Sequence, residues 1–212
     1  MPARAPVLAK LPGPHRGLRI GLFGGSFNPA HSGHRHVAET ALTRLQLDWV
    51  WWIVARGNPL KSNHGDFGAR RASANRQADH PRMRVSAIET RLGVSYTRDT
   101  LVHLKARCPA TDFVWIMGAD NLAGFHRWAA WKTIAETVPV AVVSRPGIGP
   151  EAAFSRFAST YRPARIAEAD APRLASTPAP AWTLLHAPLD PASSTTLRAR
   201  GPGTGDRLAP EG

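Results

Sequence analysis

The chain has 212 residues, 43% of them hydrophobic, which suits one domain with an ordinary apolar core. Its 27 Lys and Arg residues against 15 Asp and Glu give a net charge of +12, scattered along the chain. The sequence contains no run of about 20 apolar residues that could span a membrane. Residues 1–16 lack the apolar core of a signal peptide. The single cysteine, Cys108, excludes an intrachain disulfide. We therefore expect a cytoplasmic protein. Its positive charge is suited to binding phosphorylated small molecules, anionic lipid or nucleic acid, or it reflects only a basic, solvated surface.

Strand patterns and helix patterns alternate along the chain. Apolar, β-branched and aromatic runs predict strands at 18–23, 49–55, 83–89, 113–117, 138–144 and 182–187. Helical spacing predicts helices at 33–47, 97–107, 122–137, 151–161 and 194–200, and a polar helix or partly ordered loop at 66–80. We expect an irregular connection at 162–181, a flexible leader at 1–17 and a disordered tail at 201–212. The alternation predicts an α/β fold with a doubly wound, mainly parallel sheet, in a single domain over residues 18–200.

The segment that follows the first predicted strand has the features of a phosphate site. Gly24 and Gly25 let the backbone approach an anion closely, because glycine has no Cβ. The next predicted helix directs its free N–H groups and its positive dipole end to the same point. His31 and His34, three residues apart, fall on one side of the first helical turn. Their imidazole N–H groups are suited to binding phosphoryl oxygens.

The same histidines permit two other interpretations. One is a metal site made by His31, His34 and His36, and the other is an ordinary strand–turn–helix with surface histidines. The metal site is disfavoured because His36 points elsewhere on a helix and because no His-Glu-x-x-His pattern is present.

A second candidate phosphate element lies near the end of the chain. Ser193, Ser194 and Thr195 begin a predicted helix, where hydroxyl groups add donors to the free backbone N–H groups. Arg198 follows about one turn later, where its guanidinium can bind the same anion with two hydrogen bonds. By itself this pattern is also typical of an ordinary helix cap.

Several polar loops follow predicted parallel strands. In a doubly wound sheet, ligands bind beyond the carboxyl ends of the strands. The loops that chain order places at this edge are 24–34, 58–61, 118–121 and 144–145. We therefore expect one site rather than several.

Both phosphate elements resemble the motifs of the nucleotidylyltransferase superfamily. The superfamily pattern Gly-Gly-x-Phe-x-Pro-x-His-x-Gly-His is matched from Gly24 to His34. The late pattern Ile-Ser-Ser-Thr-x-x-Arg is matched at Ser193–Arg198, with Ala192 in place of the isoleucine. This resemblance implies a Rossmann-like sheet of the nucleotidylyltransferase type.

Further motifs are similar to those of the bacterial nicotinate-mononucleotide adenylyltransferases. They are Ser95-Tyr96-Thr97-x-x-Thr100-Leu101, then Gly118-Ala119-Asp120-Asn121 followed by Trp128, then Ser144-Arg145-Pro146. The resemblance spans residues 18–200 and is loose at 63–82, and the family's longer terminal helix after Arg198 is not matched. It implies adenylyl transfer from ATP to nicotinate mononucleotide, which yields nicotinate adenine dinucleotide and pyrophosphate in NAD biosynthesis.

The resemblance also implies roles for individual residues. The catalytic residues would be His31, His34 and Arg198. The ATP and phosphate contacts would be Gly24, Gly25, Ser26, Phe27, Gly118, Asp120, Arg145, Ser193, Ser194 and Thr195. The pyridine-nucleotide contacts would be Lys61, Tyr96, Thr97 and Trp128. Residue chemistry leaves alternatives for three of them: Trp128 as a core tryptophan, Asp120 as a loop or cap aspartate, and Lys61 as a surface lysine.

The implied reaction needs no general base, since a phosphate monoester is mostly ionised at neutral pH. We expect Mg²⁺ as cofactor, bound mainly through the ATP phosphates and water, with no metal site on the protein. ATP and nicotinate mononucleotide are the expected partners, without nucleic acid or membrane, and the oligomeric state is open. The alternatives are an adenylyltransferase of the pantetheine-phosphate type and a basic nucleotide- or nucleic-acid-binding module without turnover.

Overall fold

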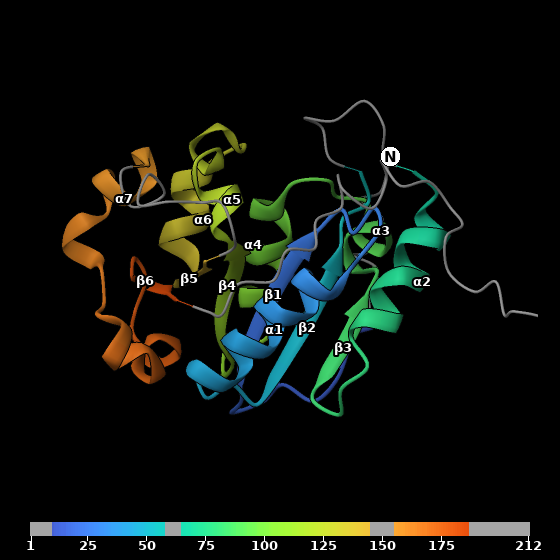
Figure 1. Cartoon of the computed structure of the whole chain (residues 1–212), viewed down its shortest axis with the longest axis horizontal. Coiled ribbons are helices and arrows are strands. Elements are labelled where there is room, and N and C mark those ends of the chain that lie inside the picture. The colour runs from blue at the N-terminus through green and yellow to red at the C-terminus, as the bar shows by residue number, and fades with distance from the viewer. Residues whose placement is uncertain (1–9, 58–64, 145–154, 187–212) are drawn as a thin grey trace, which may run out of the picture.

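The computed structural model describes residues 10–57, 65–144 and 155–186. Within them the chain forms one sheet of six strands, all parallel, in the order β3-β2-β1-β4-β5-β6 (Figure 1). The strands are β1 (Arg19–Gly25), β2 (Trp49–Val54), β3 (Met83–Ser86), β4 (Asp112–Gly118), β5 (Val140–Val143) and β6 (Trp182–Leu185). The predicted doubly wound parallel sheet is confirmed, and every described strand overlaps a predicted one.

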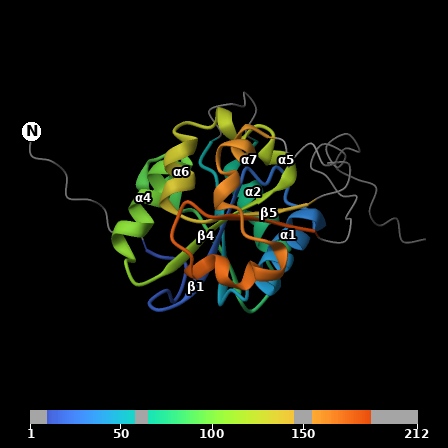
Figure 2. The ribbon, with the colours of Figure 1, turned by 90° about the vertical axis from the view of Figure 1, so that its left-hand side faces the viewer.

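Helices cover both faces of this sheet (Figure 2). Those on one face are α1 (Ser32–Arg44), α2 (Phe67–Gln77) and the 3₁₀ helix η4 (Glu168–Ser176). Those on the other are α3 (Ile88–Leu92), α4 (Thr97–Arg107), α5 (Ala119–Leu122), the 3₁₀ helix η1 (Phe125–Arg127), α6 (Trp131–Thr137), α7 (Arg156–Thr160) and the 3₁₀ helix η3 (Arg162–Ala164). None of the helices in these residues has the length and apolarity that a bilayer span requires.

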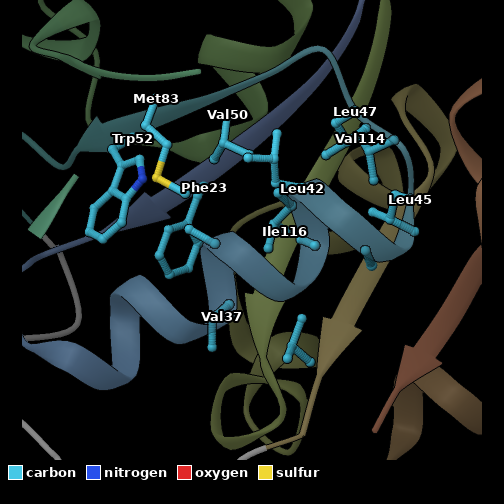
Figure 3. Packing of buried hydrophobic residues seen from close by; sticks show 14 of the residues in the cluster. Phe23, Val37, Leu42, Leu45, Leu47, Val50, Trp52, Met83, Val114 and Ile116 are labelled. Carbon is cyan, nitrogen blue, oxygen red and sulfur yellow. The ribbon is translucent and has the colours of Figure 1, made fainter. Parts of the chain in front are cut away.

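Alternation along the central strands divides the core into two layers. In β4, Phe113 and Trp115 pack with α4 and α6, while Val114 and Ile116 pack under α1. Figure 3 shows the α1 layer, in which Val114 and Ile116 meet the helix stripe that includes Leu42. Both faces of the central strands are therefore buried, as a parallel sheet requires.

Three segments differ from the prediction. The expected strand 83–89 ends at Ser86, and its last residues begin the short helix α3. The expected helix 122–137 is divided into α5, η1 and α6. The break before α6 falls at Ala130, which adopts a left-handed conformation with φ of 52°. Helical spacing had predicted one continuous helix there. The connection 162–181, expected to be irregular, contains η3 and η4.

Part of the expected leader lies against the domain. The Gly17 N–H donates to Ala110 O at 2.6 Å, and the Thr111 hydroxyl donates to His15 O at 2.8 Å. Leu11 packs on the core. Residues 1–9 and the expected tail 201–212 lie outside the described residues, as does the predicted helix 194–200.

Gly24 is the next-to-last residue of β1, and its missing side chain makes room for Trp115 of the neighbouring strand. A Cβ built on Gly24 would overlap the indole ring of Trp115, which is 2% exposed. We expect Gly24→Ala to destabilise the fold by about 2 kcal/mol or more, because the ring cannot move without disturbing the core. Denaturant unfolding measures this. Gly13→Ala is the matched control, since its Cβ would have only ordinary contacts at 3.9 Å; equal effects of the two changes would contradict the prediction.

Candidate active site

The site lies beyond the carboxyl ends of the strands, where the sheet order reverses. β1 lies between β2 and β4, so the β1–α1 loop and the β4–α5 junction leave adjacent strands. β2 and β5 end at the same edge because all strands are parallel. This is the switch point at which α/β sheets bind ligands.

His31 and His34 form a reciprocal cap at the start of α1. His31 is the N-cap residue, and its Nδ1 accepts from the Gly33 N–H at 3.1 Å. The His31 N–H donates to Nδ1 of His34 at 3.3 Å, and the two ring centroids are 3.9 Å apart. The predicted placement of both imidazoles on one side of the first turn is therefore confirmed. Histidine takes here the part that Ser and Glu take in a capping box.

This cap determines which ring nitrogen carries the proton. A backbone N–H is only a donor, so Nδ1 of each histidine must be an acceptor. In the neutral form each ring therefore holds its hydrogen on Nε2. Two Nε2–H donors and the positive end of α1 make an arrangement suited to anionic oxygens.

Aromatic packing holds the His34 ring in place. The Phe27 ring meets it edge-on at 5.2 Å between centroids, and the Phe23 ring lies at 6.2 Å. Phe27 itself is 2% exposed and packs against Trp52 at 5.1 Å. The Phe27 side chain thus supports the histidine from within the core, and only its backbone is available for the predicted phosphate contact.

The two glycines of the motif have a packing role that the sequence did not indicate. Both lie inside β1, paired with Ile53 and Val54 of β2, rather than in the loop. Gly24 makes room for Trp115, and a Cβ on Gly25 would lie 2.9 Å from the Phe27 ring. Core packing therefore requires glycine at both positions. The same lack of a Cβ also leaves room for an anion to approach the backbone. Ser26, which follows β1, is half-buried.

The candidate pyridine-nucleotide residues lie on α4 and after η1. Thr97 is the first residue of α4, and Tyr96, its N-cap residue, is 44% exposed. Trp128 is half-buried, with its ring edge-on to Trp115 at 6.3 Å and to Phe125 at 5.4 Å between centroids. Trp128 thus packs on the core and keeps part of its surface accessible.

The β4–α5 junction supplies the other described candidates. Gly118 ends β4 and caps α5, and Asp120 is an exposed residue in the first turn of α5. Ser144 follows β5, and its N–H donates to Leu185 O at 2.9 Å. The remaining candidates lie outside the described residues: Lys61, Arg145, Ser193, Ser194, Thr195 and Arg198.

Sequence reasoning did not single out a polar network that joins the two halves of the site. Arg70 of α2 donates to Ser26 O at 2.8 Å and to Arg56 O at 3.3 Å. The Arg56 N–H donates to Glu89 Oε2 at 3.0 Å, and Thr100 of α4 donates to Glu89 Oε1 at 3.5 Å. The β1–α1 loop is thereby connected to the first turn of α4. The sequence had placed Arg70 in a polar helix or loop and Glu89 at the end of a predicted strand, with no sign that the two belong to one network.

Burial perturbs the two charged members of this network. Removal from water raises the pKa of Glu89 to about 7, against the lowering effects of its hydrogen bonds and of the Arg70 charge. Burial also lowers the pKa of Arg70, which Asp66 and Glu89 partly offset by their charge. Among the described residues, no group of three or more His, Cys, Asp or Glu side chains is arranged to hold a metal ion.

Known proteins resemble this chain in sequence and in fold. A family model described as cytidylyltransferase-like matches residues 22–200. A "Probable nicotinate-nucleotide adenylyltransferase" of Methylorubrum extorquens (strain PA1) is 54% identical over 186 residues, which cover 86% of this chain and 100% of the relative. A relative of the same name from Rhizobium johnstonii is 49% identical over 190 residues, 89% of this chain and 96% of the relative. The solved Plasmodium falciparum nicotinic acid mononucleotide adenylyltransferase complexed with NaAD shares the fold, with a TM-score of 0.63 at 16% identity over 85% of this chain and 82% of that one.

The parallel sheet, the histidine pair at its switch point and the family model define a nucleotidyltransferase of the cytidylyltransferase-like class. The identity to the curated relatives extends over almost their whole length. The chain belongs to the nicotinate-nucleotide adenylyltransferase family.

Proposed function

We propose that this protein transfers the adenylyl group of ATP to nicotinate mononucleotide, forming nicotinate adenine dinucleotide and pyrophosphate. Adenylyl transfer in NAD biosynthesis is the activity of the family to which the chain belongs. The observation that carries the proposal is the His31–His34 pair, which presents two Nε2–H donors at the N-terminus of α1.

The chemistry follows from the charge of the reactants. The phosphate of the mononucleotide attacks the α-phosphorus of ATP, and the bond to pyrophosphate breaks. Because this phosphate has a second pKa of about 6, it is already a nucleophilic anion at neutral pH. The protein therefore has to position the two reactants and stabilise the charge that develops on the phosphoryl oxygens.

In this proposal His31 and His34 bind ATP phosphate oxygens together with backbone N–H groups of the β1–α1 loop. Arg198, with Ser193, Ser194 and Thr195, binds the β- and γ-phosphates and stabilises the departing pyrophosphate. Gly118, Asp120 and Arg145 contact the adenosine or the phosphates. Mg²⁺ would be held mainly by phosphate oxygens and water rather than by protein side chains, and would supply charge neutralisation.

The pyridine ring of nicotinate mononucleotide is proposed to lie by Trp128 and the start of α4. The accessible part of the Trp128 indole offers a surface for aromatic contact, and the Thr97 hydroxyl lies at the positive end of α4. Tyr96 borders the same site, and Lys61 binds the mononucleotide phosphate.

Substrate choice tests the proposal. We expect kcat/KM for nicotinate mononucleotide to exceed that for nicotinamide mononucleotide by about 10-fold or more, because a helix N-terminus favours the carboxylate and the amide carries no charge. Chromatographic detection of the two dinucleotides, with pyrophosphate release as a second readout, measures this. Equal efficiency would contradict the pyridine-site assignment. Salt-dependent RNA binding without pyrophosphate release would favour the binding-module alternative.

The location follows from the substrates. We propose that the protein acts in the cytoplasm, where ATP and pyridine nucleotides are present. Its single cysteine, Cys108, is buried and suits a reducing compartment.

A further inference from the structure

The β1–α1 loop adopts a backbone conformation that its own sequence does not favour. Phe27 has a φ of 48°, in the left-handed region that non-glycine residues rarely adopt. Such a conformation persists only where surrounding contacts impose it. Two side chains of α2 make those contacts.

The first is Arg70, which is 3% exposed. Its Nη1 donates to Ser26 O and to Ala55 O, both at 2.8 Å, and its Nη2 donates to Arg56 O at 3.3 Å. Ser26 directly follows β1, and the other two carbonyls directly follow β2. One guanidinium therefore joins the ends of two strands at the edge where the histidines lie.

The second is Ser73, one turn further along α2 and 4% exposed. Its hydroxyl oxygen accepts from the Ala30 N–H at 3.0 Å. Its hydrogen lies within reach of two carbonyls, Arg70 O at 2.8 Å and Phe27 O at 3.3 Å. Ala30 immediately precedes the N-cap histidine, so Ser73 fixes the backbone from which the first imidazole extends.

The chemistry of Arg70 suggests more than packing. A buried arginine is costly, and no described carboxylate lies within hydrogen-bond distance of this one; its Nε has no hydrogen-bond partner in the described part of the chain. Its donors are instead directed to carbonyls. A cationic donor on Ser26 O polarises that peptide group and makes the N–H on its other side, that of Phe27, a stronger donor.

We propose that Arg70 and Ser73 form a clamp that positions the β1–α1 loop, so that its N–H groups and the two histidines match the phosphates of ATP. This inference rests on the proposed function and extends it to two residues that touch no substrate. They are positioning residues, acting through the loop backbone. The clamp also explains why α2, a helix with a mostly polar exposed surface, buries one face against the loop.

The test uses Ser73→Ala, which removes one hydroxyl, and Arg70→Lys, which keeps a cation but loses the forked geometry. We expect each to raise the KM for ATP and lower kcat, with kcat/KM for ATP falling about 10- to 100-fold. The KM for nicotinate mononucleotide should stay within about twofold, because the clamp acts on the triphosphate side. Arg71→Lys and Asn75→Ala are matched controls, exposed on the same helix, and should change neither parameter.

Calorimetric titration with a non-reacting ATP analogue gives an independent readout. A weaker analogue affinity in both clamp variants, with thermal unfolding still cooperative, supports the clamp. Unchanged ATP parameters, an equal loss toward both substrates, or failure of both conservative variants to fold would overturn it. If the wild-type protein forms no dinucleotide, the proposed function fails, while analogue titration still decides whether the clamp orders the phosphate loop.

Discussion

Replacing His34 by alanine is expected to lower kcat by about 100- to 1,000-fold, the effect of removing one preorganised donor from a site of developing charge. Nδ1 of this ring is occupied by the His31 N–H, so Nε2–H is the donor that the substrate loses. The substitution also removes the acceptor of that backbone N–H, and with it half of the reciprocal cap at the start of α1. Steady-state kinetics at saturating ATP and nicotinate mononucleotide measures the change.

Conservative variants of His34 separate the loss of the Nε2–H donor from the loss of the helix cap. Glutamine places an amide N–H near the position of Nε2, whereas asparagine places its amide near Nδ1. We expect His34→Gln to retain more kcat than His34→Asn, because the glutamine amide can still donate to a phosphate. His36→Ala, on the same helix, is the control and should keep wild-type turnover. Turnover near the wild-type value in His34→Ala would refute the catalytic role of the histidine.

Strand positions and the parallel character of the sheet were accessible from the sequence because the central strands are buried on both faces. A short apolar run such as Trp49–Val54 is typical of a strand buried in a parallel sheet. Strands that alternate with helices are expected to pair in parallel, as these do. The histidine pair was accessible for a similar reason, since a three-residue spacing at a helix start allows one geometry.

The sequence did not reveal interactions that depend on long-range packing. The break before α6 falls at Ala130, which adopts a left-handed conformation that alanine does not favour and that no local pattern indicates. Arg70 and Ser73 fell in the segment 66–80, predicted as a polar helix or partly ordered loop, and nothing local shows that the β1–α1 loop covers them. Glu89 fell at the end of an apolar run and was assigned to a strand.

Arg70, Ser73 and Glu89 share a physical feature that bears on the site. Each is a polar side chain buried at the carboxyl edge of the sheet, and each binds backbone of a neighbouring loop. A buried polar network of this kind favours one arrangement of the backbone segments that it joins, because a buried polar group that loses a hydrogen bond destabilises the fold. The network thus links the β1–α1 loop to α4 at this edge, an arrangement that apolar packing alone does not specify.

Ionisation of Glu89 is expected to make the stability of the protein depend on pH. The pKa of Glu89 is raised to about 7 in the folded state, above its ordinary value of 4.5, by desolvation. The folded state therefore holds its proton more tightly than the unfolded state, and stability falls as pH rises from about 5 to 7. Above the folded pKa both states are ionised and the loss is complete.

Glu89→Gln removes this titration and keeps a neutral side chain of the same shape. Relative to wild type, we expect the variant to gain about 2–3 kcal/mol in free energy of unfolding between pH 5 and pH 8. Urea unfolding at both pH values measures the difference. Glu39→Gln is the control, since its side chain is 40% exposed on α1 and pairs with Arg35 at the surface; it should change stability by less than about 0.5 kcal/mol at either pH. A stability difference between Glu89→Gln and wild type that does not change with pH would contradict this prediction. It would mean that the pKa of Glu89 is not raised in the folded state, because its interactions with Arg56, Thr100 and Arg70 offset the cost of burial.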